Sequence, residues 1–284
     1  MFVNLVRIGL LRLFKGSRFI IGAVLALGMI FTVFLFRELL LVEEVITDAD
    51  MMEVFNAPIV EQYSGFTIGV EAGLLFCMYS TVCFVCDYYK NRQKINIEGM
   101  IRSRSKICLS EICALFIFSM TLGLFGPAVS FLGLIESGFE RILIVEYPLT
   151  FLYTTLAGGM MIFLMSLPVF FCCKLFRKKV LSIVAYGVIY AVSMFIIGFS
   201  ASFDIGVRKA LESGAVVELE VEAAPAISSL EIVGCFLFPG THLFSAATGT
   251  PTDVPFSLIV VSVLVNIIVW SALSVLASRR DSEI

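Results

Sequence analysis

Histidine is almost missing from this chain of 284 residues, in which His242 is the single copy. No pair of histidines, no His-Glu-x-x-His helix and no intramembrane aspartate pair is present, so a membrane metalloprotease or aspartyl protease is unsupported. A haem or quinone site would also need more histidines. The chain contains no Gly-x-x-x-x-Gly-Lys-Ser/Thr motif, so it cannot hold ATP through a P-loop. We therefore do not expect the chain to be an enzyme by itself.

Charge is scarce as well. Only 15% of the residues are charged, 59% are hydrophobic, and the mean hydropathy is +1.00. Because a soluble domain carries roughly a quarter charged residues, this chain lacks the polar surface that would cover it in water. The composition is typical of a membrane protein.

Six apolar runs are long enough to cross a bilayer. A hydrocarbon core about 30 Å thick needs roughly 20 apolar residues in a helix, and helical structure is required because no water is present to pair with the backbone. The runs cover residues 19–36, 67–86, 112–135, 147–173, 180–203 and 254–277. We predict an all-α integral membrane protein with six transmembrane helices in a single transmembrane domain, 1–284.

The basic residues predict the orientation of these helices. Sixteen of the 20 Lys and Arg residues lie in the N-terminal arm, in the loops after the second and fourth runs, and in the C-terminal tail. The positive-inside rule places these segments in the cytoplasm. The expected location is the cell membrane, with several crossings and with both the N- and C-termini cytoplasmic.

Residues 1–18 form a candidate amphipathic entry helix. At about 100° per residue, its polar and basic side chains gather in one arc of an otherwise apolar helix. These side chains are Asn4, Arg7, Lys15 and Arg18, with Arg12 beside them. The pattern favours a helix in the headgroup layer with its basic stripe on anionic lipid. The alternative is a plain extension of the first span.

The extracellular loop 204–253 contains a second segment of interest. Its first half is polar and acidic, but residues 232–247 are apolar, too few to span the membrane, and interrupted by Pro239, Gly240 and Thr241. We interpret this stretch as a re-entrant element that enters the membrane and turns back before the last span.

Eight cysteines invite a disulfide interpretation. Most of them lie near the predicted cytoplasmic ends of the spans, where the environment is reducing. Cys83 and Cys86 have metal-like spacing, but no second pair completes a tetrahedral site. Packing as small apolar side chains is the favoured interpretation.

Two polar residues stand out inside the apolar runs. Glu71 lies near the outer end of the second run, between Gly69 and Gly73, whose spacing permits close helix approach. Glu71 in this run would be explained by a contact in a substrate path or at a subunit interface. Simple access to interfacial water would explain it equally well. Asn266 lies midway along the last run, where a hydrogen bond between helices is favoured over a substrate contact.

The predicted cytoplasmic loop 87–111 is short, basic and polar. Gly99 is a candidate helix stop, and Ser103 is a candidate N-cap for the third span. A rigid turn between two spans would suit docking into a cleft on a soluble partner. The alternative is a solvated positive anchor.

In this loop the chain resembles the type-2 ABC transporter permeases, the membrane subunits of ABC exporters. The family pattern Gly-x-x-x-Ser-Arg is met by Gly99, Ser103 and Arg104, with Lys106 following. The broken element at Pro239 looks like the family's element before the last span. One departure is Glu111, where many relatives carry Lys.

The resemblance implies a division of labour between chains. Two permeases, identical or related, would pair with cytoplasmic ABC ATPase subunits that bind ATP and Mg, so no cofactor would be held by this chain. The resemblance also implies a coupling helix seated on the ATPase, with residues Glu98, Gly99, Arg102, Ser103, Arg104 and Lys106. Membrane lipid is a further expected partner, and nucleic acid is not.

The leading hypothesis is therefore a permease subunit of an ATP-driven exporter for an amphipathic or lipid-like substrate, such as a peptide antibiotic. The nearly uncharged spans motivate an apolar substrate. An alternative is a membrane protein that does not transport, but gives immunity to a toxin or bacteriocin or scaffolds a complex. A proton-coupled transporter is a third possibility, disfavoured because such proteins usually need several buried ionisable groups.

Overall fold

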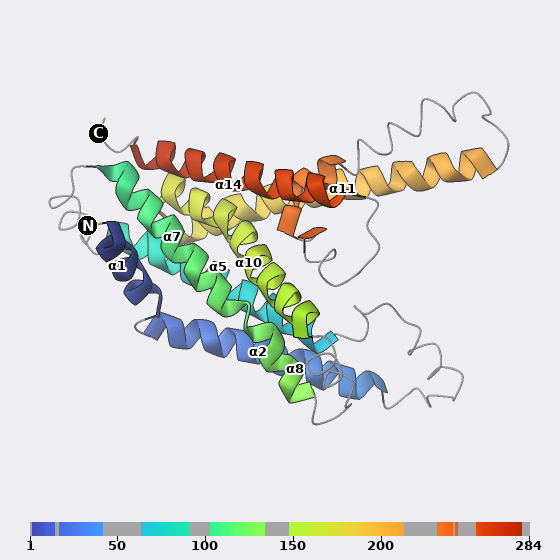
Figure 1. The fold of residues 1–284 in the computed structure, drawn as a ribbon, viewed down its shortest axis with the longest axis horizontal. Coiled ribbons are helices and arrows are strands. Elements are labelled where there is room, and N and C mark those ends of the chain that lie inside the picture. Colours follow the sequence, from blue (N-terminus) through green and yellow to red (C-terminus); the bar gives the residue numbers. More distant parts are fainter. Residues whose placement is uncertain are drawn as a thin grey trace.

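The computed structural model describes eight stretches of the chain, residues 2–14, 17–41, 64–90, 103–133, 148–212, 232–240, 242–243 and 254–279. Within them the chain is helical apart from short turns, and no strand is present. The helices are α1 (Phe2–Phe14), α2 (Ser17–Leu41), α5 (Ser64–Lys90), α7 (Arg104–Leu122), α8 (Phe125–Gly133), α10 (Pro148–Phe176), α11 (Lys179–Glu212) and α14 (Phe256–Arg279), as Figure 1 shows.

The helices have the length and composition of membrane spans. Five stretches of the described chain are long and apolar enough to cross a bilayer: Ile68–Tyr89, Arg104–Val129, Leu152–Phe176, Lys179–Ile196 and Phe256–Arg279. A sixth is added if α1 and the following Phe19–Thr32, bent by 56°, count as one broken span. The predicted all-α membrane architecture is confirmed at the level of five to six spanning helices.

The centre of the bundle is formed by α5, α7 and α10. Helix α5 packs against α2, α8 and α10, and α7 packs against α1, α10 and α14. Large side chains fully buried between these helices include Phe76, Phe118, Phe170, Leu115 and Ile162. Two of these phenylalanines form an edge-to-face cluster with Phe14 of α1, with ring centroids 5.0 Å apart for Phe14 and Phe118 and 5.8 Å apart for Phe76 and Phe118.

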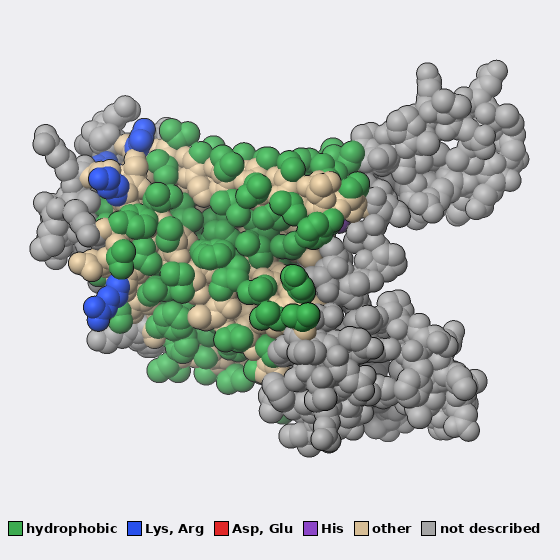
Figure 2. All heavy atoms as spheres, viewed as in Figure 1, with side chains coloured by type: hydrophobic (Ala, Val, Ile, Leu, Met, Phe, Trp, Pro, Cys, Tyr) green, Lys and Arg blue, Asp and Glu red, His purple; other side chains and the backbone are tan. Residues whose placement is uncertain are grey.

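The outer helices α11 and α14 expose most of their apolar side chains, among them Val184, Val188, Phe195, Leu264 and Ile268. Figure 2 shows this surface as a broad hydrophobic face across the bundle. The visible Lys and Arg side chains gather at one end, the same end at which Figure 1 places both termini. We call this end the basic end. An apolar belt with a basic end is the surface expected of a membrane protein.

The third span differs from its predicted bounds of 112–135. Helix α7 already begins at Arg104 behind the N-cap Ser103, ends at Leu122, and is followed after a turn by α8. At the turn, a Cβ added to Gly123 would lie 2.9 Å from the Gly159 Cα and from the Thr155 oxygen of α10. The close approach of two backbones explains why glycine stands at this break.

The N-terminal segment forms a separate helix, as predicted, but its basic side chains do not all face outward. Helix α1 packs on α7, where Leu5 and Leu13 are buried and a Cβ on Gly9 would lie 2.8 Å from the Ala114 Cβ. Arg7 is exposed, whereas Arg12 is turned into the bundle. The prediction of Arg12 beside a lipid-facing stripe is therefore wrong, since Arg12 bonds to the protein.

Helix α11 continues to Glu212, so the first part of the predicted loop 204–253 is helical. Further along, residues 232–237 and 239–240 are helical, with a break at Phe238. We call residues 232–240 the broken element. Its break lies one residue before the predicted interruption at Pro239 and Gly240, which are themselves helical, while Thr241 lies outside the described residues.

Candidate functional site

The structure describes only three of the six predicted coupling residues. Glu98, Gly99 and Arg102 lie outside the described residues. Ser103 is the N-cap of α7, with φ −108° and ψ 102°, and makes no side-chain capping bond. Its carbonyl accepts from the Lys106 and Ile107 amides, at 3.2 and 3.4 Å. The start of the helix is therefore where the sequence predicts it, without the side-chain bond that favours serine there.

The two basic residues of this helix start have different environments. Lys106 is exposed, whereas Arg104 is half-buried and lines a small cavity with Tyr88, Tyr89 and Lys174. The side chain of Arg104 is thus part of the bundle's interior packing at the basic end. Lys106 is the residue that a soluble partner could reach.

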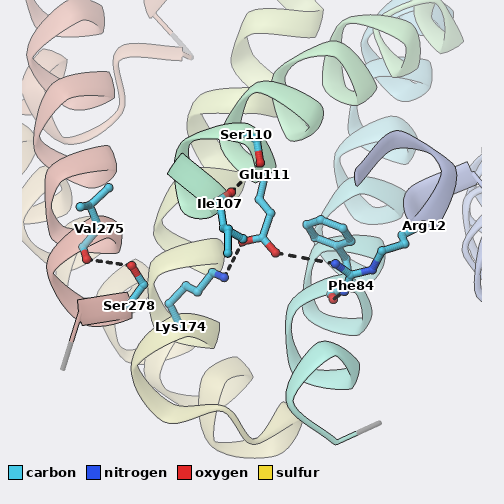
Figure 3. A network of polar contacts seen from close by, with 8 residues as sticks. All are labelled: Arg12, Phe84, Ile107, Ser110, Glu111, Lys174, Val275 and Ser278. Atoms are coloured by element: carbon cyan, nitrogen blue, oxygen red, sulfur yellow. Dashed lines mark hydrogen bonds and ion pairs between the residues drawn. The ribbon is translucent and has the colours of Figure 1, made fainter. Parts of the chain in front are cut away.

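The most unusual feature at the basic end is a buried charge cluster, formed by Arg12 of α1, Glu111 of α7 and Lys174 of α10 (Figure 3). The Lys174 ammonium donates to Glu111 Oε2. Arg12 Nη1 lies 3.7 Å from Glu111 Oε1, and Arg12 Nη2 donates to the Phe84 carbonyl of α5 at 2.9 Å. The Glu111 carboxylate therefore joins α1, α7 and α10, and the bond from Arg12 to the Phe84 carbonyl adds α5.

Aromatic rings complete the surroundings of the two cations. The Arg12 guanidinium lies 4.5 Å from the Phe84 ring centroid and 4.8 Å from that of Tyr88. The Lys174 ammonium lies 5.3 Å from the Phe170 centroid and 5.5 Å from that of Tyr88. Cation–π contacts of this kind are worth about 0.5–2 kcal/mol each, more when water is excluded. The cluster is an ion pair enclosed by protein.

A second ion pair lies at the same end. Lys179, the first residue of α11, is 3.0 Å from Asp87 of α5. The Lys179 side chain is 45% exposed and that of Asp87 is 10% exposed, so water screens this pair more than the buried cluster. In addition, Arg279 Nε of α14 donates to Ser105 Oγ at 3.1 Å. Polar contacts thus connect α1, α5, α7, α10, α11 and α14 at the basic end.

The sequence did not reveal the charge cluster. We treated Glu111 as a departure from a family pattern and placed it just before the third span, whereas it lies two turns inside α7 and is 4% exposed. Its partner Lys174 is 63 residues away and lies directly after the predicted fourth run, 147–173. The available indication was an acidic residue directly before an apolar run, at the end of a loop in which basic residues outnumber acidic ones.

Glu71 lies on the outer side of α5, where its side chain is exposed. The flanking glycines face the other way: a Cβ on Gly69 would meet the Phe125 carbonyl at 2.3 Å, and one on Gly73 would meet the Leu122 carbonyl at 3.0 Å. The spacing therefore allows α5 to approach α7 and α8 closely. Glu71 is directed away from that contact, and its suggested place in a substrate path stays a prediction.

Asn266 links the last span to the broken element. Its Nδ2 donates to the Phe236 carbonyl at 2.8 Å and to the Ser262 carbonyl at 3.0 Å, and its Oδ1 accepts from Trp270 Nε1 at 3.2 Å. The structure thus gives Asn266 a structural contact between elements. Asn266 also lines a cavity of about 300 Å³ beside Pro239 and Gly240.

The cysteines take no part in covalent links. All eight are free, and all but Cys113 are buried. Among the described residues, no three His, Cys, Asp or Glu side chains are placed to hold a metal ion.

No family model, no curated protein and no solved structure matches this chain. The resemblance to type-2 ABC permeases therefore rests on the residues quoted from the sequence.

Proposed function

We propose that this chain is the membrane-spanning permease subunit of an ATP-driven exporter, with ATP and Mg bound by a separate ABC ATPase. The observation that carries the proposal is the basic end of the bundle. There α7 begins at Ser103 with Lys106 exposed, and the buried charge cluster ties that helix to α1, α5 and α10. A soluble partner that moved the α5–α7 connection would therefore move the central helices together.

The described spans support an amphipathic or lipid-like substrate. The buried charged side chains of the central helices, Glu111, Lys174 and Asp87, are paired at the basic end, and the rest of the described interior is aliphatic and aromatic with interspersed serine and threonine hydroxyls. A strongly charged solute would find few polar groups to replace its water. The exposed apolar faces of α11 and α14 would contact membrane lipid or a second, identical or related permease.

Charge reversal at Lys106 tests the coupling. We expect Lys106→Glu to release a co-purifying ATPase from the tagged chain in mild detergent, lowering recovered ATP hydrolysis about tenfold, because a basic contact in the docking surface becomes repulsive. Lys178→Glu is the matched control, since Lys178 is also exposed at the basic end but belongs to the α10–α11 turn. It should retain the ATPase. We prefer Lys106 to Arg104, whose replacement would also disturb the interior.

A chain that purifies without any ATPase, and whose cellular effect survives Lys106→Glu, would contradict the proposal. That result would favour the second function, immunity to a toxin or bacteriocin or the scaffolding of a membrane complex. The two outcomes are distinguished by nucleotide hydrolysis in the purified sample.

We further propose that the basic end faces the cytoplasm of the cell membrane. The supporting observation is that both termini and the visible Lys and Arg side chains share that end (Figures 1 and 2). Epitope tags at the N- and C-termini should both resist protease in intact cells and be cleaved after permeabilisation. Cleavage of either tag in intact cells would overturn this orientation.

A further inference from the structure

We infer that the cavity between α10, α11, α14 and the broken element binds a single hydrocarbon chain of a lipid-like molecule. Its volume is about 300 Å³. An apolar protein cavity of about 150 Å³ holds one benzene molecule, so this one has room for roughly twelve carbons. The volume alone suggests an alkyl chain rather than a complete lipid.

The walls of the cavity have no charge. Helix α10 supplies Leu164, Met165 and Pro168, and the other walls are mainly aliphatic and aromatic side chains of α11, α14 and the broken element. Among the residues that the structure describes, no Lys, Arg, Asp, Glu or His side chain lines the cavity. The amide of Asn266 and the indole N–H of Trp270 are already used in bonds within the protein. The hydroxyls of Tyr186, Tyr190 and Ser193 also line the cavity, but none of them carries a countercharge, so a charged ligand group would lose its water without an opposite charge, whereas a hydrocarbon chain has none to lose.

The broken element closes one end of this cavity and is held by all three helices. Its Phe236 carbonyl accepts from Asn266 of α14 at 2.8 Å, and the Phe238 ring meets Tyr190 of α11 edge-to-face at 5.7 Å. On the α10 side, a Cβ on Gly240 would lie 3.0 Å from the Met161 Cα. The close backbone contact shows why glycine stands at position 240, and the three contacts hold the broken element against the cavity.

The mouth of the cavity opens toward the apolar surface of the bundle. The lining residues Val265 and Val269 of α14 are 39% and 45% exposed, and Tyr190 of α11 is 36% exposed. These positions lie near the middle of the candidate spans Phe256–Arg279 and Lys179–Ile196. Acyl chains are the solvent at that depth, so a chain can enter sideways from the bilayer. Binding needs no ATPase, and this inference therefore stands apart from the proposed function.

A photoreactive palmitic acid bearing a diazirine near its methyl end tests the inference on the full-length chain in detergent. Cross-links mapped by mass spectrometry should fall on the α10, α11 and broken-element walls. Saturated fatty acids from octanoate to palmitate should compete with the photoreactive probe. Their affinity should rise about fourfold per methylene and level off at about twelve carbons. Labelling spread evenly over the outer faces of α11 and α14, or competition that never levels off, would mean general lipid contact and would overturn the site.

Two substitutions on α14, one lining the cavity and one outside it, provide a matched comparison. Val269→Trp fills the mouth and should reduce wall labelling about tenfold, because a bulky ring takes the volume of several methylenes. Val261→Trp is the control, since Val261 is also exposed on α14 but does not line the cavity. Ser193→Leu narrows the opposite wall on α11 and should act like Val269→Trp. Equal labelling of all three variants and the unaltered chain would refute the inference, with folding monitored by thermal unfolding.

Discussion

Replacing Glu111 by Gln is expected to destabilise the protein by about 3–5 kcal/mol, the usual cost of removing one partner of a buried ion pair. Glu111 is the only acidic group of the charge cluster, and Lys174 is 3% exposed. Without the carboxylate, Lys174 and Arg12 would face each other as like charges in a water-poor interior. The cost arises from the two cations left behind more than from the bond that is lost.

Thermal unfolding in detergent, followed by tryptophan fluorescence or circular dichroism, measures this effect. The double variant Glu111→Gln with Lys174→Met should recover at least half of the loss, since it removes the buried ammonium that Glu111→Gln alone leaves without its carboxylate. The double-mutant cycle should therefore be strongly non-additive. Additive effects, or a loss below about 1 kcal/mol for Glu111→Gln, would show that the cluster is not a unit.

Asp87→Asn serves as the comparison at the same end of the bundle. Its partner Lys179 has a side chain 45% exposed, so the pair is partly screened and should contribute about 1 kcal/mol or less. A larger loss from Asp87→Asn than from Glu111→Gln would contradict the idea that burial decides which ion pair stabilises this bundle.

The boundaries of the fourth and last spans could be predicted because hydropathy is a local property. The predicted run 147–173 corresponds to α10, Pro148–Phe176, and the run 254–277 to α14, Phe256–Arg279. Each follows from the number of consecutive apolar residues a bilayer requires. The break at Phe238 could be predicted to within one residue for the same reason, since Pro239 restricts the backbone of the residue before it.

The contacts between helices could not be predicted in this way. Arg12 lies beside the basic arc when α1 is considered alone, and only the position of α7 against α1 shows that it turns inward. Likewise, Asn266 is a polar residue in a span until the broken element places the Phe236 carbonyl beside it. Charge counts along a sequence indicate which end of a helix is basic, but not which basic residues are enclosed.

Gly69→Val is the second substitution expected to have a large effect, a loss of more than about 3 kcal/mol or failure to fold. A Cβ at this position would lie 2.3 Å from the Phe125 oxygen, 2.7 Å from the Phe125 carbonyl carbon and 2.8 Å from the Gly126 Cα. All three atoms belong to the α8 backbone, so no side chain can rotate to make room. Helices α5 and α8 would have to separate.

Graded substitutions at other glycines of the described helices test this explanation. Gly28→Ala in α2 should be neutral or slightly stabilising, because nothing lies within 4 Å of its added Cβ and alanine favours a helix over glycine by about 1 kcal/mol. Gly73→Ala should be intermediate, since the Ile162 Cδ1 and the Leu122 oxygen lie 3.0 Å away.

Thermal unfolding of these three variants, with Gly69→Ala added, should therefore rank them by the distance to the nearest backbone atom. Intrinsic helix propensity makes the opposite prediction, because every glycine-to-alanine change would then stabilise its helix. A stabilised Gly69→Ala would mean that α5 and α8 are not packed backbone to backbone. A destabilised Gly69→Ala beside a neutral Gly28→Ala would show that the Gly69 and Gly73 spacing sets the helix approach, and that Glu71 between them is free to serve another role on the outer face of α5.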